Sequence, residues 1–112
     1  MKPFTIACCQ LRAGDLDEAE LSLERILKLL DEAGEKEADL VLLPECSYPA
    51  YYLKSQNPYD KPGVRKYSEI CDLLGQKAQE YGYWLVAGLA TPIANDKLAN
   101  SGVVFDPKGN QC

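Results

Sequence analysis

Apolar residues along this chain follow two kinds of pattern. Four short apolar runs are typical of strands buried in a sheet, and they are residues 4–11, 39–43, 84–90 and 100–106. Two longer segments, residues 15–33 and 64–81, repeat apolar side chains at every third or fourth position, which predicts amphipathic helices. The resulting order, β-α-β-α-β-β, predicts an α/β layered domain.

Both predicted helices carry signals at their ends. Asp15, followed three residues later by Glu18, has the pattern of a capping box at a helix N-terminus. Gly34 and Gly82 are placed to end the first and second helix. Because the first helix joins the first two strands, these strands should be parallel, with a right-handed crossover.

The strand at residues 39–43 leads directly into Pro44 and Glu45. Proline has no N–H to donate, so strand pairing should stop there. The carboxyl ends of parallel strands are where α/β folds place their chemistry, which makes Glu45 the first functional candidate. Taken alone, the position favours an ordinary solvated carboxylate. A long loop, residues 47–62, follows it, and such loops are often functional.

The composition and charge of the chain argue against some kinds of binding partner. The chain is 46% hydrophobic and 26% charged, as in a soluble globular protein. Its 17 acidic and 12 basic residues give a net charge of −5, which argues against nucleic acid or an anionic membrane as partner. No signal peptide or run of transmembrane length is evident, so we expect a cytoplasmic location.

The chain has no histidine and five cysteines, namely Cys8, Cys9, Cys46, Cys71 and Cys112. The odd count and the absence of a CxxC pair argue against a disulfide framework or a zinc site. Without histidine, no His-based catalytic triad is possible. Cys8 and Cys9 are consecutive in the first strand, so one should face the core and the other the opposite side of the sheet.

A set of motifs occurs in the order and at the spacing of one known family. They are Gln10, Glu37-Ala38-Asp39, Leu42-Leu43-Pro44-Glu45, Tyr48-Pro49-Ala50-Tyr51, Val86-Ala87-Gly88, Asn100-Ser101 and Asp106-Pro107-Lys108-Gly109. On these motifs the chain resembles the N-terminal half of a carbon–nitrogen hydrolase of the nitrilase superfamily. The resemblance implies that residues 1–112 are a partial domain, half of a four-layer α-β-β-α sandwich.

The resemblance also implies a chemistry, with a glutamate, a lysine and a cysteine acting on a small amide or nitrile without metal or cofactor. Glu45 matches the glutamate, a general base that takes the thiol proton and exchanges protons at a partly desolvated strand end. The thiol would form a thioester or thioimidate, and the lysine would stabilise developing charge. Tyr51 matches an aromatic residue that could line the substrate pocket, or equally pack the loop. Asn100 and Ser101 are expected to satisfy backbone groups at a strand entry.

The resemblance places the catalytic lysine and cysteine beyond the last residue of this sequence. Cys112 lies too early to be the nucleophile. Cys46 adjoins Glu45, but consecutive residues at a strand end point in divergent directions. We therefore expect the chain alone to be inactive.

Three interpretations remain at this point. In the first, the chain is a fragment of a thiol amidohydrolase that exposes apolar sheet surface and a free strand edge, which favours self-association or pairing with a C-terminal half. In the second, it is a non-catalytic binding or assembly module that retains the half-fold. In the third, it is an unrelated small α/β domain. We favour the first.

Overall fold

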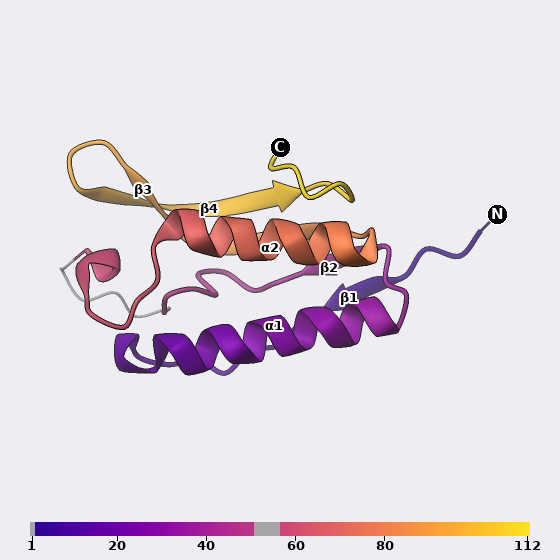
Figure 1. Cartoon of the computed structure of the whole chain (residues 1–112), viewed down its shortest axis with the longest axis horizontal. Helices are drawn as coiled ribbons and strands as arrows, with labels where there is room; N and C mark the ends of the chain where they lie inside the picture. Colours follow the sequence, from indigo (N-terminus) through magenta and orange to yellow (C-terminus); the bar gives the residue numbers. More distant parts are fainter. Residues whose placement is uncertain (1, 51–56) are drawn as a thin grey trace.

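The computed structural model describes residues 2–50 and 57–112 of the chain (Figure 1). One four-stranded sheet carries two α-helices side by side on one face. The strands are β1 (Ile6–Cys8), β2 (Leu40–Leu42), β3 (Trp84–Ile93) and β4 (Lys97–Phe105). The helices are α1 (Ala19–Glu35) and α2 (Tyr67–Tyr81), and the short 3-10 turns are η1 (Leu16–Glu18) and η2 (Pro58–Asp60). The predicted α/β order is confirmed.

The strands lie in the order in which they occur along the chain. β1 pairs with β2 and β2 with β3 in parallel, whereas β3 and β4 form an antiparallel hairpin. The predicted parallel pairing of the first two strands is therefore confirmed. One row of the sheet runs through all four strands, from Cys8 through Leu42 and Val86 to Val104. The carboxyl ends of the three parallel strands consequently lie at the same edge of the sheet.

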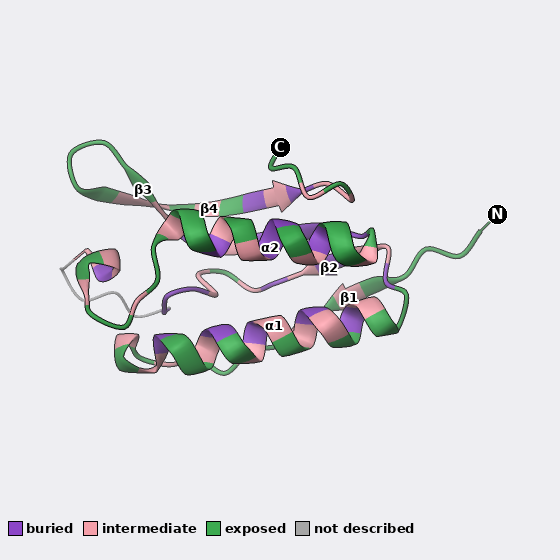
Figure 2. Ribbon diagram, in the orientation of Figure 1, coloured by how far each residue is buried: buried purple, intermediate pink, exposed green. Residues whose placement is uncertain are grey.

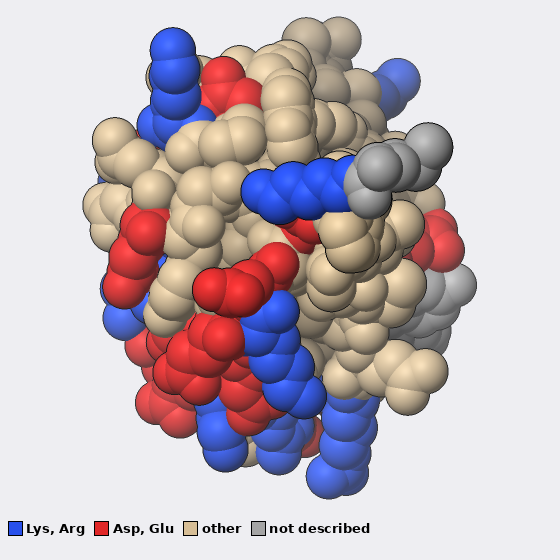
Figure 3. Space-filling view, turned by 90° about the vertical axis from the view of Figure 1, so that its right-hand side faces the viewer, with Lys and Arg blue, Asp and Glu red and all other residues tan. Residues whose placement is uncertain are grey.

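The two faces of the sheet differ in what covers them. Leu85, Ala87 and Leu89 of β3 belong to one buried cluster with inner residues of α1 and α2. Figure 2 shows the buried stripes along the two helices. The alternate residues of the strands face the other way, and there Ile6 and Trp84 keep 52% and 44% of their surface exposed. Figure 3 shows charged side chains crowded at the lower left and a broad uncharged area toward the right. We call the side of the sheet away from the helices the open face.

Two predictions about helix ends were wrong. Asp15 makes no side-chain capping bond, and the chain enters α1 through η1 instead. Gly34 does not end α1, which continues to Glu35. Gly34 instead allows α1 and the Tyr81 ring of α2 to pack closely, since a Cβ built at residue 34 would lie 2.2 Å from that ring. Gly82 does end α2, with a φ of 68°, as predicted.

Replacing Gly34 with alanine tests this helix contact. Alanine normally stabilises a helix interior by about 1 kcal/mol relative to glycine. Here overpacking against Tyr81 should reverse the sign and cost about 1–3 kcal/mol of unfolding free energy, measured by urea denaturation. In a Tyr81→Ala background the same change should be neutral or stabilising. An equal loss in both backgrounds would contradict the contact.

The strand bounds also differ from the prediction. β1 covers only three of the residues expected in the first strand, while β3 and β4 extend past their predicted ends and meet in a tight turn. Asn95 and Asp96 in this turn have φ values of 61° and 55°. Asparagine and aspartate accept this left-handed conformation more readily than most residues, and the turn allows the hairpin to close.

Candidate active site

The segment from Pro44 to Tyr48 bulges out of the sheet at the end of β2. The Leu43 amide still donates to the Val86 carbonyl at 2.9 Å. The backbone hydrogen bonds to β3 are then interrupted, and Cys46 takes a left-handed φ of 48°. Hydrogen bonding to β3 resumes where the Ser47 amide donates to the Gly88 carbonyl at 2.8 Å. Pro44 therefore interrupts the pairing, as predicted, but does not end it.

Gly88 of β3 makes room for this bulge. A Cβ built at residue 88 would lie 2.3 Å from the Pro44 carbonyl oxygen and 2.6 Å from the Glu45 Cα. Both contacts are with backbone atoms, which cannot swing aside as a flexible side chain would. The bulge thus rests directly on the bare backbone of β3, and this packing fixes the height of Glu45 above the sheet.

Hydrogen bonds hold the bulge and the chain segments next to it in place. The Ser47 hydroxyl donates to the Pro44 carbonyl at 2.5 Å, which closes the turn on itself. Tyr48 is fully buried, and its hydroxyl accepts from the Arg65 amide at 2.7 Å. The Tyr59 hydroxyl donates to the Ala90 carbonyl at 2.5 Å, and burial raises the pKa of this phenol. Both tyrosine hydroxyls are therefore neutral structural anchors near pH 7.

Glu45 points away from the bulge toward β4. Its Oε1 accepts a hydrogen bond from the Nδ2 of Asn100, a residue in the middle of β4. Two expectations were wrong. The Glu45 side chain is exposed and not partly desolvated. Asn100 lies inside a strand instead of at its entry, and its side chain bonds to a carboxylate and not to the backbone.

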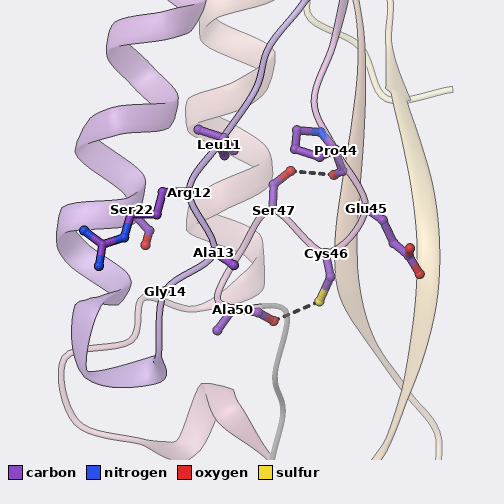
Figure 4. A pocket seen from close by; sticks show the side chains of 10 residues that line it. All are labelled: Leu11, Arg12, Ala13, Gly14, Ser22, Pro44, Glu45, Cys46, Ser47 and Ala50. Carbon is purple, nitrogen blue, oxygen red and sulfur yellow. Dashed lines mark hydrogen bonds between the residues drawn. The ribbon is translucent and has the colours of Figure 1, made fainter.

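Cys46 points in a different direction from Glu45 (Figure 4). Its Sγ donates to the Ala50 carbonyl at 2.9 Å. Burial, together with the neighbouring Glu45 charge, raises the pKa of the Cys46 thiol. The predicted divergence of these two side chains is confirmed, and the thiol is held in its protonated form near neutral pH.

A cavity of about 220 Å³ lies behind the bulge, on the side away from the Glu45 carboxylate (Figure 4). It is lined by Leu11, Arg12, Ala13, Gly14, Ser22, Pro44, Glu45, Cys46, Ser47 and Ala50. Tyr51, the predicted pocket residue, lies outside the described residues. Of the two cysteines near β1, Cys8 is exposed and Cys9 packs against the core, as the alternation predicts.

Residues 2–50 and 57–112 contain neither a cluster of metal-binding side chains nor a membrane-spanning helix. No three histidine, cysteine or acidic side chains there are grouped as a metal site would require. No helix in these ranges is both long enough and apolar enough to cross a membrane.

The chain is similar in sequence to one protein family and to several of its relatives. The family profile described as carbon-nitrogen hydrolase matches residues 5–111. Omega-amidase NIT2 of Xenopus tropicalis is 37% identical over 90 residues, which cover 79% of this chain. Nitrilase homolog 2 of Dictyostelium discoideum is 32% identical over 115 residues, covering 96% of this chain.

Solved structures share the fold at lower sequence identity. An amidase from Nesterenkonia sp. superposes with a TM-score of 0.77 at 23% identity, over 97% of this chain and 40% of its own. A carbon-nitrogen hydrolase from Helicobacter pylori G27 gives a TM-score of 0.75 at 24% identity, over 96% of this chain and 37% of its own. The chain spans about a third of the length of the curated relatives it matches.

Proposed function

The chain belongs to the carbon–nitrogen hydrolase family, and on that premise we propose that it is the N-terminal part of an amidohydrolase acting on small amides or nitriles. Residues 1–112 would form the first portion of one catalytic domain. The observation that carries the proposal is the position of Glu45, at the carboxyl end of β2, on a bulge that Gly88 and Ser47 hold against β3. Family membership excludes an unrelated α/β domain.

Glu45 would act as the general base. In this role its carboxylate takes the proton of a cysteine thiol, and the resulting thiolate attacks the amide or nitrile carbon. With an amide, the C–N bond then breaks and ammonia leaves with the proton that Glu45 returns, which gives a thioester. With a nitrile, the nitrogen takes up that proton, which gives a thioimidate. Water hydrolyses either intermediate, restores the thiol and, for the thioimidate, releases the nitrogen as ammonia. A structure of a mutant of the amidase from Nesterenkonia sp. AN1 shows the result of Michael addition of acrylamide at the active site cysteine. This supports thiol chemistry for the relative and, through the shared family, for the enzyme we propose here.

The lysine and the cysteine of this mechanism would come from sequence beyond residue 112, so we propose that residues 1–112 alone are inactive. Cys46 does not replace the missing thiol, because its Sγ is bonded to the Ala50 carbonyl and its pKa is raised. Tyr51 stays a proposed substrate contact. The substrate class rests on the relatives, which are described as amidases.

The open face would receive the second sheet of the sandwich. Phe4, Ile6 and Trp84 leave 63%, 52% and 44% of their surfaces exposed on or beside it. Exposed apolar side chains gathered on one side of a sheet are typical of an interface. In the absence of a C-terminal half, a second copy of the chain would cover this face.

Replacing Trp84 with glutamate tests this interface. We expect the chain to self-associate at micromolar concentrations and Trp84→Glu to shift it toward monomer in sedimentation velocity. Leu21→Glu is a matched control, because Leu21 is also 44% exposed but lies on α1, away from the open face. A wild-type chain that stays monomeric, or equal effects of the two variants, would argue against the interface.

The proposal as a whole is tested on the complete reading frame that encodes this chain. We expect the DNA to continue past the Cys112 codon into a lysine shortly after the turn and a cysteine at the next strand end, and the complete product to release ammonia from small amides. A stop codon after Cys112, with no neighbouring frame supplying those residues, would refute catalysis by this route and leave a binding or assembly module.

A further inference from the structure

We infer that Asn100 is a positioning residue that orients the Glu45 carboxylate, an inference that rests on the proposed role of Glu45 as general base. The Asn100 Nδ2 donates to the Glu45 Oε1 across 55 positions of sequence. Among the described residues, no other hydrogen bond and no ion pair involves this carboxylate. Asn100 therefore supplies the one described contact that selects a direction for the Glu45 side chain.

Both partners are attached to rigid parts of the fold. Asn100 lies in the middle of the nine-residue strand β4, directly opposite Ala90 of β3. The Glu45 main chain rests on Gly88, where no side chain separates it from the sheet. The Asn100 side chain is short, with few rotatable bonds, and the main chains of both residues are fixed. Little conformational entropy is therefore lost when the hydrogen bond forms.

The sheet between Glu45 and Asn100 carries no side chains, so the side chains of these two residues can meet above it. Gly88 on β3 is paired with Gly102 on β4, so neither strand places a side chain in this row. A Cβ built at Gly102 meets no atom within 4 Å, which shows that open space remains there. The Asn100 side chain projects on the same face of β4, two residues away, and reaches Glu45 without an obstacle.

The chemical character of asparagine suits a base better than a cation would. An arginine or lysine beside a carboxylate strongly favours its ionised form and so opposes proton uptake. A neutral amide fixes the orientation with a weaker preference for the charged form. It also engages Oε1 only, which leaves Oε2 free to receive a proton.

Nuclear magnetic resonance on the 112-residue chain tests the contact without any activity. The resonances of the Asn100 side-chain amide protons should change with pH in the wild type, and Glu45→Gln should abolish that dependence. Cys46 also lies beside Glu45, and Cys46→Ser should leave the dependence unchanged. The inference would be overturned if the Asn100 side-chain amide resonances did not change with pH in the wild type, or if they still changed with pH in Glu45→Gln.

Kinetics of the complete enzyme test the role. Asn100→Ala should lower kcat about 10- to 100-fold, the loss of one hydrogen bond to a charged group, with KM nearly unchanged. Asn100→Asp, of the same shape, should lose at least as much because it replaces the donor with a like charge. Ser101→Ala on the opposite face of β4 serves as control.

The outcomes separate the two claims. If Glu45→Gln abolishes activity while Asn100→Ala leaves kcat unchanged, the positioning role is wrong and the proposed function stands. If Glu45→Gln is itself active, the proposed function fails, whatever the resonances of Asn100 show. A rise in KM at constant kcat for Asn100→Ala would assign Asn100 to substrate binding and overturn the positioning role.

Discussion

Glu45→Gln in the complete enzyme is expected to lower kcat for amide hydrolysis by about 10²- to 10⁴-fold, the usual contribution of a general base. Glutamine has nearly the same shape as glutamate, and its carbonyl oxygen can still accept the hydrogen bond from Asn100. The variant therefore keeps the geometry and loses only the ability to take up a proton. Initial rates of ammonia release, with the fold checked by circular dichroism, provide the measurement.

Glu24→Gln is the matched control for this substitution. Glu24 is an exposed glutamate like Glu45, so the two substitutions make the same chemical change at similarly exposed positions. Glu24 lies on α1, however, and not on the bulge. Its kcat should equal that of the wild type. If Glu45→Gln retained activity within a few-fold of Glu24→Gln, Glu45 would not be the base, and the catalytic part of the proposal would fall.

The periodicity of apolar residues was sufficient to predict the fold, because it reflects which side of each element is buried. The helical stripes and the strand at residues 39–43 correspond to α1, α2 and β2, and Gly82 ends α2 as its sequence position suggests. Gly34 shows where this reasoning fails. A glycine can end a helix or admit a neighbouring ring, and only the position of Tyr81 decides between these uses.

The candidate site could be predicted only in part. Pro44 marks the end of β2, and so the location of Glu45 followed from local sequence. The partner of Glu45 did not, because the contact with Asn100 depends on the register of the β3–β4 hairpin. The Asn95-Asp96 turn sets that register. β4 begins at Lys97, earlier than the apolar run at residues 100–106 predicted.

Gly88→Ala is expected to have the largest effect on the structure of the site. A Cβ at residue 88 would lie 2.3 Å from the Pro44 carbonyl oxygen, and relief requires the bulge to lift from β3. We expect a loss of about 1–3 kcal/mol or more in unfolding free energy, as for other overpacked positions. The hydrogen bond from the Ser47 amide to the Gly88 carbonyl would weaken as the bulge moves. Urea denaturation measures the loss of stability.

Gly102→Ala provides a control that isolates the steric term. Gly102 is paired with Gly88 across the β3–β4 hairpin, neither glycine has a positive φ, and a Cβ at 102 meets open space. Both changes reduce the entropy of the unfolded chain equally, so this contribution cancels when the two variants are compared. Gly102→Ala should therefore be neutral or slightly stabilising. Equal stabilities would mean that the bulge does not rest on β3, and the position of Glu45 would then need another support.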